Sequence, residues 1–179
     1  MAGTIMKEIL SHGDPLILTA CIHATIAHRG QLRKGTDIPY VTHPLRVARV
    51  LTEETHYPVS SELIAAAILH DVVEDTEYDI DSFPEKVRKI VYLVSDPTGE
   101  GFGHRIEAIQ RIRNEADAIM VKMADRYSNL SEINDYSAKY QAKPDVRESS
   151  RAVVMVAKEA GLEGTDLYLK LSDIVKKWE

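Results

Sequence analysis

The chain contains only one cysteine, Cys21, among its 179 residues. A single thiol excludes an intrachain disulfide and any zinc site built from several cysteines. Cys21 lies within the apolar run 16–27. The sequence therefore predicts a buried, unreactive thiol rather than a catalytic nucleophile.

Long apolar runs and a signal-peptide pattern are also missing. No stretch reaches the about 18 consecutive apolar residues that a membrane-spanning helix requires. The N-terminus has no charged segment followed by an apolar core and a cleavage site. We therefore expect a cytoplasmic protein without a membrane partner.

The chain has no excess of positive charge. It carries 22 Lys and Arg against 28 Asp and Glu, a formal net charge of -6. This balance argues against a nucleic-acid partner bound through bulk charge. Its content of 44% hydrophobic and 28% charged residues is ordinary for a globular protein. The length predicts one domain, residues 1–179, with a core of its own.

No segment alternates apolar and polar residues strongly enough to predict a strand. Helix signals are frequent instead, such as the N-cap pair Asp14-Pro15 and the helix entry His43-Pro44. A loop rich in glycine, residues 96–103, is expected to be mobile. The sequence thus predicts an all-α fold. Its expected helices cover about 15–29, a stretch from 43, one from 60 or 61 to about 71, one from 84, and about 104–114, 117–133, 144–160 and 165–177.

The segment 69–76 is the most informative part of the sequence. His70 and Asp71 follow a run of strong helix formers, and Glu74 and Asp75 come one helical turn later. His70 and Glu74 share a face while the helix lasts. Polar groups at the end of an apolar helix are costly unless something satisfies them, and a bound cation would do so. An ordinary solvated acidic turn is the alternative.

Two further patches contain groups of the same kinds. His43 precedes a proline at a helix entry, where an imidazole could be a metal ligand, or only a cap or a surface residue. Lys122, Asp125 and Asn129 fall at positions i, i+3 and i+7 and form a polar stripe on an otherwise apolar helix. Taken alone, such a stripe is normally solvated surface.

A third patch is basic and includes Arg33 and Lys34 in the loop before His43. In an acidic protein this local excess is compatible with an anion-binding area. Exposed helix faces also carry such charges without a function.

In chain order these residues form the pattern H…HD…D, which resembles that of the HD superfamily of metal-dependent phosphohydrolases. The surrounding segments resemble the hydrolase domain of RelA/SpoT homologues; they are 27–34, 39–44, 69–76 and 122–130. The chain is most similar to a stand-alone small alarmone hydrolase. The resemblance implies an HD-domain helical bundle with a metal site between helices.

The resemblance also implies an activity and residue roles. The activity is metal-dependent hydrolysis of the 3′-pyrophosphate of the guanosine alarmones ppGpp and pppGpp to GDP or GTP and pyrophosphate. One divalent cation, Mn²⁺, is expected. Its implied ligands are His43, His70, Asp71 and Asp125. Glu74 and Asp75 match the pair that handles the nucleophilic water. The implied substrate-binding residues are Arg33, Lys34, Lys122 and Asn129.

Other functions fit parts of the pattern. Another HD phosphohydrolase could act on an adenosine alarmone, on the 2′-phosphate of NADPH or on a nucleoside monophosphate, because such enzymes need the same metal set. A catalytically inactive alarmone-binding sensor is a second alternative, although it would not need Glu74 and Asp75. A purely structural helical domain would leave the aligned polar groups unexplained. A homo-oligomer is also compatible with the sequence.

Overall fold

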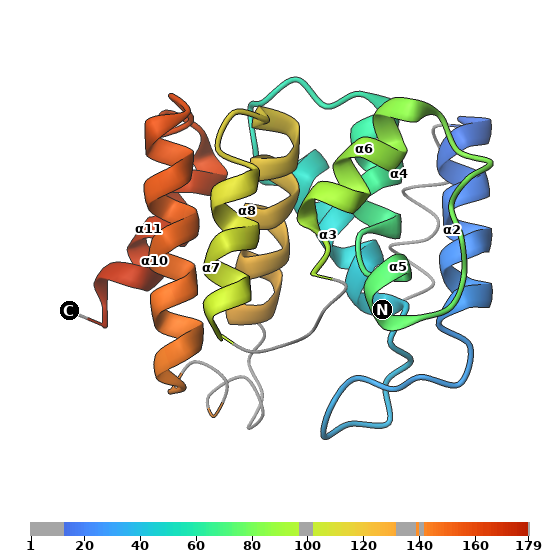
Figure 1. Ribbon diagram of the computed structural model, residues 1–179, viewed down its shortest axis with the longest axis horizontal. Helices are drawn as coiled ribbons and strands as arrows, with labels where there is room; N and C mark the ends of the chain where they lie inside the picture. The colour runs from blue at the N-terminus through green and yellow to red at the C-terminus, as the bar shows by residue number, and fades with distance from the viewer. Residues whose placement is uncertain (1–12, 97–101, 132–138, 140–141, 179) are drawn as a thin grey trace.

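The computed structural model describes residues 13–96, 102–131, 139 and 142–178. Regular structure in these residues is helical, with an isolated antiparallel bridge between Leu32 and Pro39 (Figure 1). This confirms the predicted all-α fold. The helices are α2 Pro15–Ala27, α3 Thr42–Glu53, α4 Ser61–Leu69, α5 Val72–Asp75, α6 Glu85–Val94, α7 Phe102–Arg111, α8 Ala116–Ser131, α10 Pro144–Glu159 and α11 Asp166–Lys176.

Short polar side chains begin several of these helices where the sequence predicted a start. The carboxylate of Asp14 accepts a hydrogen bond of 2.8 Å from the backbone N–H of Leu16, and Pro15 occupies the first turn of α2. Ser60 caps α4 by accepting from the N–H of Leu63. The Ser60 cap fixes the start of α4. The last residue of this helix, Leu69, directly precedes the His70-Asp71 pair.

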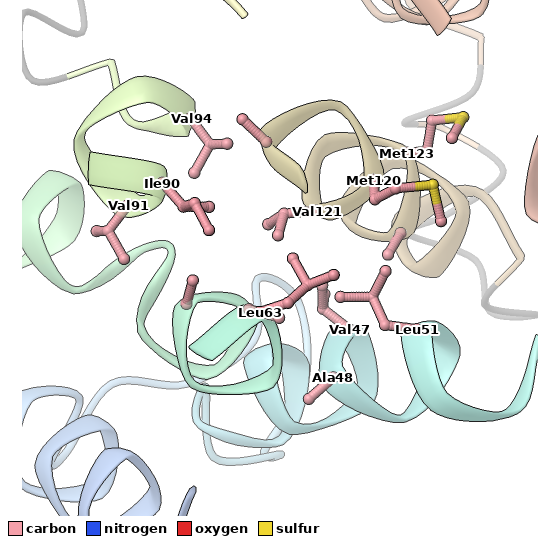
Figure 2. Packing of buried hydrophobic residues seen from close by; sticks show 14 of the residues in the cluster. Val47, Ala48, Leu51, Leu63, Ile90, Val91, Val94, Met120, Val121 and Met123 are labelled. Atoms are coloured by element: carbon pink, nitrogen blue, oxygen red, sulfur yellow. The ribbon is translucent and has the colours of Figure 1, made fainter. Parts of the chain in front are cut away.

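The helices form a row in which α2 lies at one end and α10 and α11 lie at the other (Figure 1). Helix α4 packs against α2, α3 and α6, while α8 packs against α3, α4, α6, α10 and α11. Apolar side chains from α3, α4, α6 and α8 meet between these helices, among them Val47, Leu63, Ile90 and Met120 (Figure 2). Burial of this apolar surface holds α8 against α3 and α4.

The clearest difference from the predicted helix bounds lies at α7. Helix α7 covers Phe102–Arg111, so it begins and ends two to three residues before the predicted range 104–114. Residues 97–101 of the loop expected to be mobile, and the last two residues of the predicted helix 117–133, lie outside the described residues.

Among the residues that the structure describes, none belongs to a helix with the length and apolar character needed to cross a lipid bilayer.

Cys21 lies on the inner face of α2, with 2% of its surface exposed. Burial raises the pKa of its thiol to about 11. The thiolate is the reactive form of cysteine, so the fold makes this side chain inert at neutral pH. The predicted buried thiol is confirmed.

Candidate active site

Four titratable side chains from three parts of the fold converge between α3, α4 and α8. His43 lies in the first turn of α3, and His70 and Asp71 follow the last residue of α4. Asp125 projects from the middle of α8. All but Asp71 are buried, which is unusual for charged groups unless they are paired or bind a metal.

The ring nitrogens and carboxylate oxygens of this cluster face one another. His43 Nε2 lies 3.2 Å from Asp125 Oδ1 and 3.6 Å from Asp71 Oδ2. His70 Nε2 lies 3.0 Å from Asp71 Oδ1 and 3.9 Å from Asp125 Oδ1. The structure thus brings together the four residues that the resemblance implies as metal ligands.

The hydrogen bonding of His70 defines which nitrogen faces the cluster. Its Nδ1 lies 2.8 Å from the carbonyl oxygen of Ala67, an acceptor that requires Nδ1 to carry the proton. Nε2 then faces the cluster, and this buried atom makes no hydrogen bond within the described part of the chain. In the neutral ring, Nε2 would carry the lone pair that a cation binds. An imidazole held in this way is typical of a metal ligand.

The two carboxylates of the cluster, Asp71 and Asp125, need positive charge beside them to stay ionised in these surroundings. Burial alone would raise the pKa of Asp71 and Asp125, but the neighbouring rings, and Lys122 beside Asp125, hold both pKa values below their ordinary range. Burial also disfavours a charged imidazole, yet Asp71 and Asp125 raise the pKa of His70 to about 9. A divalent cation would compensate the same carboxylates while leaving the imidazoles neutral.

The donor set fits such an ion. Ligand atoms of His43, His70 and Asp71 all lie within 4.8 Å of one another. Two imidazoles with carboxylate oxygens suit a divalent first-row transition metal better than calcium or magnesium, which prefer oxygen ligands alone. The site can therefore hold a divalent cation and leave coordination positions for other ligands.

Glu74 and Asp75 lie on α5, a single turn of helix that follows the interruption of the helix at His70-Asp71. The sequence indicated a shared helical face for His70 and Glu74, whereas the structure ends α4 at Leu69 and starts α5 at Val72. Glu74 Oε2 accepts a hydrogen bond of 2.9 Å from the backbone N–H of Asp96. Restricted solvation raises the pKa of both carboxyls, and the charge of Asp71 adds to the effect.

The polar stripe of α8 faces the cluster instead of solvent. Asn129 Nδ2 donates to Asp125 Oδ1 at 2.7 Å, and Lys122 Nζ lies 3.7 Å from Asp125 Oδ2. Lys122 also donates to the carbonyl oxygen of Val94. From the loop before α3, Arg33 Nη2 donates to Asn129 Oδ1 at 3.0 Å. These contacts place two cationic side chains next to the candidate metal ligands.

A pocket of about 360 Å³ opens over the cluster. This volume is within the range of small-molecule sites. Its lining is mainly polar and consists of Arg33, Tyr40, His43, Asp71, Glu74, Asp96, Ala108, Ile109, Lys122, Asp125, Arg126 and Asn129. Two of the residues expected at the site, Lys34 and Asp75, are exposed and are not part of this lining.

Sequence reasoning gave no role to several lining residues. Arg126 follows Asp125 and lies one turn after Lys122, so the stripe on α8 could have indicated it. Ala108 and Ile109 are apolar residues of α7 with no chemical signature, and only packing shows that they form a wall of the pocket. Tyr40 lies in the segment 39–44 that carries the resemblance, and its hydroxyl donates a hydrogen bond to Asp71 Oδ2.

Comparison with known proteins gives matches over most of the chain. Residues 20–154 match a family described as the HD domain. A human protein named guanosine-3′,5′-bis(diphosphate) 3′-pyrophosphohydrolase MESH1 is 34% identical over 163 residues, which cover 86% of this chain and 88% of that protein. A GTP pyrophosphokinase of Streptomyces coelicolor is 30% identical over 88% of this chain but only 20% of its own length. A solved structure, reported as a metazoan orthologue of SpoT that hydrolyses ppGpp, superposes with a TM-score of 0.73 at 26% identity, covering 92% of this chain and 96% of the other.

Proposed function

The chain belongs to the HD-domain family, and from this premise we propose that it is a metal-dependent hydrolase of guanosine 3′,5′-bis(diphosphate) alarmones. The reaction removes the 3′-pyrophosphate of ppGpp or pppGpp and yields GDP or GTP. The observation that carries the proposal is one pocket lined by Arg33 and Lys122 together with His43, Asp71 and Asp125. The activity named for the human relative supports the same reaction.

We assign His43, His70, Asp71 and Asp125 as the ligands of one divalent cation, with Mn²⁺ as the ion. Their mixed nitrogen and oxygen donors are compatible with Mn²⁺. When bound, the cation supplies stabilisation of phosphoryl charge and lowers the pKa of a water molecule. The backbone of α4 contributes by fixing the His70 ring through the carbonyl oxygen of Ala67.

Glu74 and Asp75 are assigned to the attacking water. A carboxylate with a raised pKa accepts a proton more readily than a fully solvated one, which favours general-base catalysis near neutral pH. The backbone N–H of Asp96 holds one oxygen of Glu74 and leaves the other for water. Two neighbouring carboxyls in different surroundings can also divide the roles of base and acid.

Arg33, Lys122 and Asn129 are assigned to the substrate. A bis-diphosphate carries negative charge at both the 3′ and the 5′ ends, so it needs cationic groups away from the metal as well as next to it. Arg33 supplies planar donors at one side of the pocket, and Lys122 supplies a charge at the α8 side. Lys34 is exposed, and its assigned contribution is limited to attraction of the anionic nucleotide from solvent.

We also propose that residues 1–179 form a single HD-type domain. The family match ends at residue 154, within α10. Helix α11 nevertheless packs against both α8 and α10, and Leu162, Leu167 and Leu171 belong to the same apolar core as α3 and α4. The C-terminal helices therefore support α8, which carries Asp125.

A substrate panel tests the proposed function. The protein is incubated with Mn²⁺ and ppGpp, the matching adenosine alarmone, NADPH or GMP, and released pyrophosphate and phosphate are measured separately. We expect pyrophosphate from ppGpp at the highest kcat/KM of the panel. Phosphate release from NADPH or GMP without pyrophosphate release from either alarmone would instead assign the chain to a general HD phosphohydrolase. Binding of ppGpp without turnover would assign it to a sensor.

A further inference from the structure

The hydroxyl of Tyr40 lies between a candidate metal ligand and a candidate catalytic acid. It donates a hydrogen bond of 2.7 Å to Asp71 Oδ2, and the Asp75 carboxyl is a second neighbour of the same hydroxyl. A phenol hydroxyl has one proton, so it can donate to only one of the two carboxylates at a time. In the structure this proton is donated to Asp71.

The surroundings of Tyr40 hold this donor in place. The backbone N–H of Tyr40 donates to the carbonyl oxygen of Gln31 at 2.9 Å, and the Gln31 side chain donates to the carbonyl oxygen of Asp75 at 3.1 Å. On its other side Gln31 Oε1 lies 2.8 Å from Nδ1 of the buried His28, whose ring is 4.8 Å from the Tyr40 ring. The loop before α3 and the end of α5 are thus tied together through Gln31.

The bond to Asp71 also distinguishes the two oxygens of that carboxylate. Oδ2 accepts from Tyr40, while Oδ1 faces His70 Nε2 at 3.0 Å. A ligating carboxylate is normally oriented by a hydrogen bond of this kind from outside the metal shell.

We propose that Tyr40 is a positioning residue that orients the Asp71 carboxylate for the divalent cation. This role depends only on the metal site and not on the proposed function.

The variant Tyr40→Phe removes the hydroxyl and keeps the ring. Loss of an outer partner of a metal ligand typically costs about 10–100-fold in metal affinity or activity. Tyr57→Phe is the matched control, because the Tyr57 hydroxyl also donates to an aspartate, Asp117 Oδ1, at 2.9 Å, but Asp117 does not line the pocket. Thermal unfolding of both variants measures the structural cost of losing one such bond.

Two readouts test the role. The first is the Mn²⁺ affinity of metal-free protein, measured without substrate by competition with a chromophoric chelator. We expect a loss of about 10-fold or more for Tyr40→Phe and no loss for Tyr57→Phe. An unchanged affinity in Tyr40→Phe would overturn the proposal.

The second readout is kcat and KM for pyrophosphate release at saturating Mn²⁺. We expect the kcat of Tyr40→Phe to recover toward the wild-type value with little change in KM, since an excess of cation offsets its weaker binding. A change in KM with unchanged Mn²⁺ affinity would overturn the proposal, because Tyr40 would then act on the substrate and not on Asp71. A wild-type protein that releases no pyrophosphate would refute the proposed function, and the affinity measurement would still decide the role at Asp71.

Discussion

Arg33 and Asn129 are joined by a hydrogen bond of 3.0 Å across 96 positions of the sequence. Asn129 in turn donates to Asp125 at 2.7 Å. A single amide therefore connects a loop cation to a candidate metal ligand on α8. This connection fixes the guanidinium of Arg33 at the pocket, whereas the next residue, Lys34, is exposed to solvent.

Arg33 and Lys34 are therefore expected to differ in how strongly they affect the KM for ppGpp. Arg33→Ala should raise KM for ppGpp by about 10-fold or more, because one charged hydrogen bond contributes roughly 1.5–3 kcal/mol. Lys34→Ala should change KM less than about threefold, as expected for an exposed charge. Initial rates of pyrophosphate release over a range of ppGpp concentrations measure both. Equal effects of the two substitutions would contradict the assignment of Arg33 to the pocket.

The acids of α5 are expected to affect turnover rather than metal binding. Glu74→Gln and Asp75→Asn should each lower kcat by about 10²–10⁴-fold, the usual contribution of a general acid or base. Mn²⁺ affinity should stay near the wild-type value in Glu74→Gln, which alters no assigned ligand. Near-normal kcat in both variants would show that neither carboxylate takes part in proton transfer.

The raised pKa values of Glu74 and Asp75 predict the acid limb of the activity profile. A general base works only when deprotonated, so kcat should fall as pH decreases through a pKa above that of a solvated carboxyl. The profile of kcat at saturating ppGpp measures this limb. A tenfold increase in Mn²⁺ should leave its position unchanged; a limb that moves to lower pH with added Mn²⁺ would instead report protonation of metal ligands.

Cys21 should lower the stability of the fold at alkaline pH. The fold raises its pKa from 9.0 to about 11, so the folded state favours the protonated thiol. This contribution is complete below the unfolded-state pKa and is lost as pH rises through the folded-state value. Two pKa units correspond to about 2–3 kcal/mol of the free energy of unfolding. Urea unfolding between pH 8 and 11, as working values, measures it.

The control for this prediction is Cys21→Ala, which should show a weaker decrease in stability over the same pH range. Folded wild-type protein should also react with a thiol reagent far more slowly than protein in urea, because Cys21 is 2% exposed. Equal rates of labelling in the two conditions would contradict the burial of this side chain.

Much of this arrangement could be predicted from local sequence. The Asp14-Pro15 pair and Ser60 marked helix starts through hydrogen bonds to their own neighbours. His70 and Asp71 were recognisable because they share one short motif. In each case the signal lies within one or two helical turns.

Other features depend on contacts between distant segments. The direction of Lys34 relative to Arg33, the wall formed by Ile109 of α7, and the bond from Tyr40 to Asp71 are set by how the helices pack. Neighbouring residues in a loop can point to opposite sides, and an apolar pocket wall has the same composition as core. Sequence patterns therefore indicated the chemistry of the site better than its shape.

The central claim is that the chain cleaves a 3′-pyrophosphate as one unit in a metal-dependent reaction. Phosphorus NMR of ppGpp incubated with the protein and Mn²⁺ tests it most directly, with a parallel sample in which a chelator has removed the metal. The account predicts GDP and inorganic pyrophosphate in equal amounts, and no products in the metal-free sample. Inorganic phosphate as the first product, or unchanged pyrophosphate release without metal, would contradict it.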